Sequence, residues 1–320
     1  MFRFDKEQKV CNIAGIKVGG QPGENPPLLI ANMFQKGDRI LESRRQRKFD
    51  RARATEYIHQ LETLSAQTGV PALVAMVANT PDEMKAYVDF FVGVTDMPFA
   101  IDIWKADVRL EAARYVAELG LQDRLLYNSI TPWDADIPGQ VAALRDMGIK
   151  HVVLQAFDVA DKGPRGRITS LQQTLPLVEK GGFESILVDT AVMGLPTGAF
   201  SLRANWLVKE QFGLPVGGAP ANGTYMLLKA RKFPQWQDFL QSWGREGFVG
   251  IDAGTHAVMA VLWSDFLLYG PMTGNARIFG AVAAASAMLA VLAYDEGAPL
   301  PTDERHPLNL LFPEVVKQLE

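Results

Sequence analysis

Short apolar runs alternate along the chain with longer stretches in which apolar residues recur at helical spacing. Runs of this length are typical of strands buried on both faces of a parallel sheet. The stretches between them, such as Ala54–Thr68, Pro81–Val92, Leu110–Leu119 and Ile137–Met147, carry apolar residues at i, i+3 and i+4 and predict amphipathic helices. The eight predicted strands are Pro27–Asn32, Ala72–Val77, Phe99–Trp104, Leu125–Asn128, His151–Phe157, Ser185–Asp189, Leu214–Gly218 and Asp265–Tyr269.

The alternation of strands and helices fits either a closed (β/α)8 TIM barrel or a large doubly wound sheet. A dinucleotide-binding sheet needs a G-x-G-x-x-G turn between a strand and a helix. The nearest candidate, VGGQPGE at residues 18–24, is followed by Asn-Pro-Pro and a strand, so it fails this test. We therefore predict a barrel, formed by residues 1–320 as a single domain because no linker or internal repeat interrupts the chain.

The two ends of the chain differ from the regular alternation. The opening KVCNIAGIKVGG predicts a hairpin of two short strands around Ala14-Gly15, placed over the N-terminal mouth of the barrel. Between the seventh and eighth strands the sequence predicts two helical stretches instead of one: Thr224–Ala230 with Trp236–Arg245, and then Gly254–Trp263.

Composition narrows the possible functions. A net charge of −4 argues against a nucleic-acid partner, and the single Cys11 excludes an internal disulfide. The N-terminus has no apolar signal region, and the longest apolar stretch, Gly280–Tyr294, has about 15 residues, fewer than the roughly 20 that span a bilayer. The sequence thus predicts a cytoplasmic protein without a membrane span.

Candidate polar side chains follow five of the predicted strands, at the ends where the strands of an α/β barrel meet at one mouth. Taken singly, each of these residues could be a turn or helix-cap residue. The four His residues show no metal-ligand spacing, and the carboxylates stand singly, so we expect no metal site and favour a neutral heterocycle rich in N–H and C=O groups. The candidates are Asp102, Asn128, Gln155, Asp158, Asp189, and Asn222 after a Gly-rich segment that contains Gly218.

Other residues also lie just beyond predicted strands. Trp104 and Trp133 either flank the mouth or pack inside, and the sequence leaves both open. The loop Asp161–Arg167 is rich in Gly and Arg and could serve as a mobile lid.

Several motifs resemble those of one protein family. The opening MFRFDKEQKV with IAGIKVGGQPGE, and the later segments YNSIT, ILVDTAV, GGAPANG and SDFLLYGPM, are similar to the H subunit of tetrahydromethanopterin S-methyltransferase and its soluble relatives. The resemblance runs nearly end to end. It implies a pterin-binding barrel in which Asp102, Asn128 and Asp189 hold the pterin ring and Asn222 lies near its N5.

The resemblance implies an enzyme that moves a methyl group between methylcobalamin and N5 of tetrahydrofolate, giving 5-methyltetrahydrofolate and Co(I). The corrinoid would come with a partner protein, since the chain has no Asp-x-His-x-x-Gly motif, and related barrels suggest a homodimer. Two alternatives stay open: a tetrahydromethanopterin-linked subunit and a non-catalytic docking subunit for the corrinoid protein. Dihydropteroate synthase is disfavoured because Asn79-Thr80-Pro81 and GGAPANG lack the basic residues that pyrophosphate needs.

Overall fold

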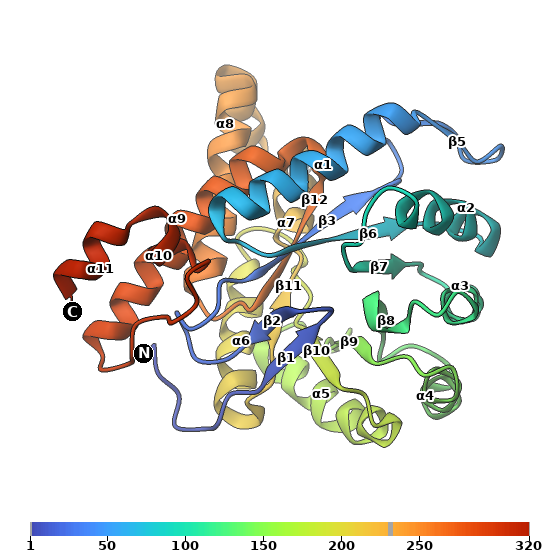
Figure 1. Cartoon of the computed structure of the whole chain (residues 1–320), viewed down its shortest axis with the longest axis horizontal. Helices are drawn as coiled ribbons and strands as arrows, with labels where there is room; N and C mark the ends of the chain where they lie inside the picture. The colour runs from blue at the N-terminus through green and yellow to red at the C-terminus, as the bar shows by residue number, and fades with distance from the viewer. Residues whose placement is uncertain (1, 230–232, 320) are drawn as a thin grey trace.

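The computed structural model describes residues 2–229 and 233–319, which fold into a closed barrel surrounded by helices (Figure 1). Eight parallel strands of this part of the chain form the barrel in the order β10-β11-β12-β3-β6-β7-β8-β9. All the strands expected from the apolar runs are present, and the predicted (β/α)8 barrel is confirmed. Their bounds are β3 Leu28–Met33, β6 Ala72–Val77, β7 Phe99–Asp102, β8 Leu125–Ile130, β9 His151–Gln155, β10 Ser185–Asp189, β11 Val216–Gly218 and β12 Phe266–Pro271.

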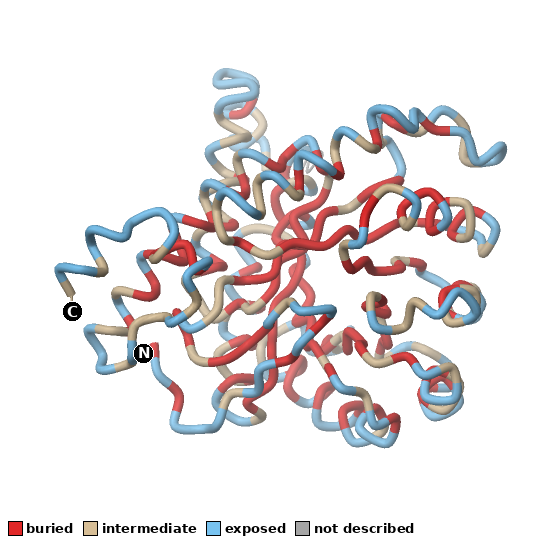
Figure 2. The backbone as a smooth tube through the Cα atoms, in the orientation of Figure 1, coloured by how far each residue is buried: buried red, intermediate tan, exposed pale blue. Residues whose placement is uncertain are grey.

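Helices connect the strands and cover the outside of the barrel, and Figure 2 shows the buried residues concentrated in the strands and the helix faces against them. Helix α2 illustrates the local signals: the Thr80 side chain accepts a hydrogen bond from the Glu83 N–H, and Pro81 opens the first turn. The helices are α1 Arg51–Thr68, α2 Pro81–Val92, α3 Ala106–Glu118, α4 Ile137–Asp146, α5 Pro164–Val178, α6 Gly198–Phe212, α7 Pro220–Lys229, α8 Pro234–Val261, α9 Asn275–Asp295, α10 Pro307–Leu311 and α11 Pro313–Leu319; 3-10 turns occur at η1 Gln122–Arg124, η2 Glu179–Gly181 and η3 Met272–Gly274.

The inside of the barrel is apolar over most of its depth. Every second residue of a strand points to the same face, so each strand contributes alternate side chains to the interior. The resulting cluster includes Ile30 of β3, Ala100 of β7, Leu126 of β8, Val153 of β9 and Leu187 of β10. This layer forms a dry floor beneath the carboxyl ends of the strands.

The N-terminal hairpin closes the barrel at the amino ends of its strands, as predicted. Strands β1 (Val10–Ile13) and β2 (Ile16–Gly19) pair antiparallel. Cys11, Ile13 and Val18 are buried in the same apolar cluster as the barrel interior. The hairpin therefore completes the interior core and keeps water from entering at this end.

Two segments depart from the sequence-based expectation. A second small hairpin, β4 (Leu41–Ser43) with β5 (Lys48–Phe49), was not predicted. The two helical stretches expected at Trp236–Arg245 and Gly254–Trp263 form one element, α8, interrupted at Gly244, whose φ of 54° and ψ of −133° are not helical. Because glycine has no Cβ, it adopts this conformation without steric cost. The expected helix Thr224–Ala230 corresponds to α7, and Ala230 lies outside the described residues.

Helix α9 is longer than the apolar stretch from Gly280 suggested. Together with η3 it spans 24 residues, Met272–Asp295, with a mean hydropathy of 1.9, which is long and apolar enough to cross a membrane. More than half of its most apolar window, 56%, is buried inside the fold, where α9 packs against α1, α8 and α10. The helix thus serves as an outer helix of the barrel, and the absence of a membrane span stays a prediction.

If the hairpin completes the core, truncation of its buried face should weaken the whole barrel. Replacing the fully buried Ile13 with Ala should lower the free energy of unfolding by about 2–5 kcal/mol. The matched change Val10→Ala, at a residue of the same hairpin that is 43% exposed, should alter it by less than about 0.5 kcal/mol. Urea denaturation measures both, and equal losses would show that the hairpin adds nothing specific to the core.

Candidate functional site

Above the apolar floor, the next inward-facing position of most strands is polar. Strand register places these positions side by side: Asp102 of β7 is paired with Asn128 of β8, and Gln155 of β9 is paired with Asp189 of β10. Asn32, at the corresponding end of β3, donates a hydrogen bond to Asp102 across 3.5 Å. The same alternation that fills the core with apolar side chains therefore builds a ring of amides and carboxylates at the carboxyl ends of the strands.

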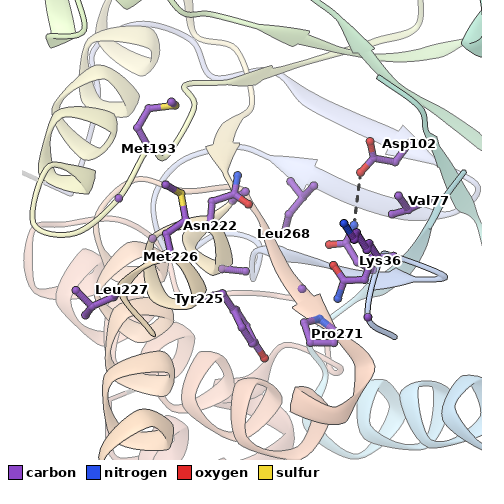
Figure 3. Close-up of a pocket in the computed structure, with 18 of the residues that line it drawn as sticks. Lys36, Val77, Asp102, Met193, Asn222, Tyr225, Met226, Leu227, Leu268 and Pro271 are labelled. Carbon is purple, nitrogen blue, oxygen red and sulfur yellow. Dashed lines mark hydrogen bonds between the residues drawn. The ribbon is translucent and has the colours of Figure 1, made fainter. Parts of the chain in front are cut away.

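This polar ring lines a cavity of about 1440 Å³. Five of the seven predicted site residues line it, namely Asp102, Asn128, Gln155, Asp189 and Asn222. Figure 3 shows Asp102, Val77 and Lys36 on one wall, facing Met193, Asn222 and Met226 on the other. The volume exceeds the roughly 300–1,000 Å³ of ordinary small-molecule sites, so a single bicyclic ring would leave room for a second reactant.

Two of the predicted residues lie away from the cavity lining. The Asp158 carboxylate accepts a hydrogen bond from the Ala160 N–H at 2.7 Å and acts as a turn residue. Gly218 is buried in β11 behind Asp189, and a Cβ added there would lie 3.3 Å from the Asp189 Oδ1. Gly218 thus gives space to the carboxylate and does not itself face the cavity.

Burial changes the acid–base behaviour of the two carboxylates. Loss of solvent raises the pKa of Asp102 to about 6, an effect opposed by the positive charge of Arg109 and the hydrogen bond from Asn32. Loss of solvent also raises the pKa of Asp189 to about 6, while the Ala191 N–H, which donates to its Oδ1 at 2.7 Å, and the charge of Arg167 lower it. Both side chains are therefore mostly ionised at neutral pH and ready to accept hydrogen bonds.

The strand-end loop that carries Asp189 is held rigidly from two sides. Arg167, only 2% exposed, donates to the backbone carbonyls of Thr190 and Ala191. The Thr190 hydroxyl lies within hydrogen-bond distance of the Ser201 hydroxyl and of the Asn205 side-chain oxygen, both on α6. These contacts fix the direction in which the carboxylate points.

The burial of Arg167 bears on the interpretation of Asp161–Arg167 as a mobile lid, which stays a prediction. Its guanidinium also donates to the carbonyls of Lys162 and Gly163, and α5 begins within the segment at Pro164. Arg167 thus anchors the C-terminal end of the segment to the barrel, whereas Asp161, Lys162 and Arg165 are exposed.

The wall opposite Asp102 contains charged and hydroxyl groups that the sequence did not reveal. Arg277 of α9 lines the cavity and forms an ion pair of 2.8 Å with the fully buried Asp252 of α8. Its guanidinium also donates to the Tyr225 hydroxyl at 3.2 Å, and the Thr224 hydroxyl donates to Asp252 at 2.8 Å. The network joins α7, α8 and α9, and Tyr225 lies three residues after Asn222 on α7.

Further charged cavity residues that sequence reasoning missed lie in the loop after β3. Lys36, Asp38 and Arg39 line the cavity, and Asp38 accepts a hydrogen bond from the Phe34 N–H at 3.0 Å. Their position beyond the end of the first barrel strand was the signal available, since loops at the carboxyl ends of barrel strands build the mouth.

The site can hold a ring by hydrogen bonding at its edge. Ionised carboxylates accept N–H bonds, while the amides of Asn128 and Gln155 both donate and accept. Taken together, fold and site define a (β/α)8-barrel protein with a polar cavity at the carboxyl ends of its strands, suited to a heterocycle rich in N–H and C=O groups.

The comparisons with known proteins identify the family. The model of the tetrahydromethanopterin S-methyltransferase MtrH subunit matches residues 6–300, and the chain belongs to this family. The H subunit of tetrahydromethanopterin S-methyltransferase from Methanosarcina mazei is 34% identical over 322 residues, which cover 97% of this chain and all of that protein. The corresponding H subunit from Methanopyrus kandleri is 32% identical over 324 residues, with the same coverage of both chains.

A solved structure supports the fold. The crystal structure of Plasmodium falciparum HPPK-DHPS with pteroate superposes with a TM-score of 0.55 at 10% sequence identity, covering 98% of this chain and 54% of that one. At this low identity the likeness concerns the barrel fold alone.

The raised pKa of Asp189 makes stability depend on pH. The folded protein binds the proton with a pKa of about 6 instead of the ordinary 3.8, so this carboxyl stabilises the fold below about pH 4, and the contribution is lost as the pH rises through 6. The amide of Asp189→Asn carries no titratable proton, so the variant does not lose this stability as the pH rises. Its side-chain oxygen can still accept the hydrogen bond from the Ala191 N–H. The ligand-free variant should therefore gain stability over wild type between pH 4.5 and 7.5, by on the order of 1–3 kcal/mol.

Urea denaturation of both proteins at pH 4.5, 6 and 7.5 measures this difference. Asp158→Asn, which makes the same change of carboxylate to amide outside the cavity lining, is the matched control. If Asp189→Asn became less stable relative to wild type as the pH rises, this would contradict a raised pKa of the buried Asp189 carboxyl.

Proposed function

We propose that the protein is a methyltransferase that acts at N5 of a reduced pterin bound in the barrel cavity. The observation that supports this most is the convergence of Asp102, Asn128 and Asp189 on the cavity, with Asn222 on the facing wall, in a chain of the MtrH family. The pterin's pyrimidine edge presents N–H donors and a carbonyl acceptor that match these side chains. Charge-assisted hydrogen bonds of this kind contribute about 1.5–3 kcal/mol each, enough to orient the ring.

The comparisons favour tetrahydromethanopterin over the tetrahydrofolate expected from the sequence, because relatives that match nearly the full chain are named for it. Both cofactors share the reduced pterin ring that the carboxylates and amides would hold. We therefore propose tetrahydromethanopterin as the pterin and keep tetrahydrofolate as the alternative that direct comparison of the two cofactors decides.

The second reactant in our proposal is a methylated corrinoid carried by a partner protein. On transfer, the N5–C bond forms from the N5 lone pair, the Co–C bond breaks with its electron pair left on cobalt as Co(I), and the cationic N5 then loses its proton to solvent. The chain itself needs no nucleophile for this step. Its contribution is to hold the ring so that N5 faces the mouth and to accommodate the positive charge that develops on N5.

Asn222 is placed for that last role. It lies in the first turn of α7 and lines the cavity, on the wall that faces Asp102 (Figure 3). Its side-chain oxygen can face the developing charge, directly or through water. A homodimer and a cytoplasmic location remain predictions from the family resemblance and the sequence.

The roles of Asp189 and Asn222 should separate in kinetics. Asp189→Ala should weaken pterin binding by about ten- to a hundredfold, the loss of one charge-assisted hydrogen bond. Asn222→Ala should lower kcat by about a hundredfold and change KM little, because its interaction strengthens only as N5 becomes charged. Anaerobic absorbance of the Co(I) product, with methylcobalamin and each pterin in turn, measures both.

Asp158→Asn is the control and should behave as wild type. Turnover with tetrahydrofolate but none with tetrahydromethanopterin would reverse the choice of pterin. Tight pterin binding without turnover, even with a native corrinoid protein, would instead favour a docking subunit.

A further inference from the structure

Two tryptophan side chains stand exposed at the carboxyl ends of β7 and β8, beside the cavity. Trp104, between β7 and α3, is 77% exposed, and Trp133, between β8 and α4, is 41% exposed. Their rings stack on each other with centroids 5.7 Å apart and planes 26° from parallel. Contact of two large aromatic rings with water is unfavourable in free energy. Contiguous exposed apolar surface of this kind commonly marks a binding site.

A buried ion pair fixes the two loops that carry these rings. The Arg109 guanidinium of α3 donates to the Asp134 carboxylate at 3.1 Å, and the side chains of this pair are only 2% and 5% exposed. Arg109 also donates to the backbone carbonyls of Ile103 and Trp104, and Asp134 accepts from the Thr131 N–H at 2.9 Å. The loops after the adjacent strands β7 and β8 (Figure 1) are thus joined by buried contacts, which place the backbone of the two tryptophans side by side.

The two tryptophans adjoin the cavity, since Trp104 lines it together with Arg109. The charges of Arg109 and Asp134 neutralise each other below the surface. The two tryptophans above them therefore offer uncharged, flat indole faces. Such a surface suits a large, flat, uncharged ligand, and indole N–H groups can donate to amide carbonyls at the edge of that ligand.

We propose that Trp104 and Trp133 form a contact surface for the corrin ring that the partner protein brings to the mouth. This inference rests on the proposed function, because that reaction requires the corrin to approach N5 from this mouth. A corrin is broad, mostly uncharged and fringed with amides, which matches the exposed indole faces. The size of the cavity beyond the polar ring provides the space for this approach.

Equilibrium dialysis against methylcobalamin, followed by its absorbance, tests the surface independently of turnover. Trp104→Ala and Trp133→Ala should each weaken methylcobalamin binding by about tenfold, through loss of ring stacking. Tetrahydromethanopterin affinity, measured on the same variants, should stay at the wild-type value. Trp243→Ala, which removes a tryptophan of α8 that is 63% exposed, is the matched control and should change neither affinity.

Other outcomes overturn the proposal. If wild type and both variants bind methylcobalamin equally, Trp104 and Trp133 do not contact the corrin. The same follows if the wild-type protein binds pterin but does not bind methylcobalamin. Weaker pterin binding with unchanged methylcobalamin binding would assign the pair to the tail of the pterin. Failure of wild type to bind either pterin would instead refute the proposed function, which the methylcobalamin measurement alone does not test.

Discussion

The site depends on a change of polarity along the inward-facing positions of the barrel strands. Below this change the interior is apolar and closed by the β1–β2 hairpin, and above it the same strands present amides and carboxylates. Because the strands are in register, the polar side chains lie at one level and line a single cavity. The dry floor beneath them is also the reason that the pKa values of Asp102 and Asp189 are raised.

Two buried arginines offset the cost of placing carboxylates above an apolar core. Arg109 and Arg167 each lie in the first turns of the helix after a barrel strand and donate to the carbonyls of strand-end loops. Each also lies near enough to one cavity carboxylate to lower its pKa. Each arginine donates hydrogen bonds to backbone carbonyls and places a positive charge near a carboxylate. It therefore both stabilises the loop and favours the ionised carboxylate, so the barrel can hold charged groups directly above its apolar floor. The Arg109–Asp134 pair extends this arrangement to the exposed tryptophans at the rim.

The sequence revealed the parts of this structure that depend on local pattern. The apolar runs predicted the barrel, and their polar ends predicted Asp102 and Asp189 as cavity residues, because position along a strand determines the face to which a side chain points. Contacts between distant segments were not visible in the sequence. The pairing of Arg277 with Asp252 joins two helices, and the burial of Arg167 depends on carbonyls more than twenty residues away. Asp158 lies outside the cavity lining, because a polar residue after a strand also serves to form a turn.

The central claim is that a reduced pterin binds with its pyrimidine edge against the polar ring. A crystal structure of the protein with tetrahydromethanopterin tests this most directly. The account predicts the pterin ring within hydrogen-bond distance, about 3 Å, of the Asp102, Asn128 and Asp189 side chains, with N5 toward Asn222 and the open mouth. A pterin bound elsewhere, or with its pyrimidine edge turned away from both carboxylates, would contradict it.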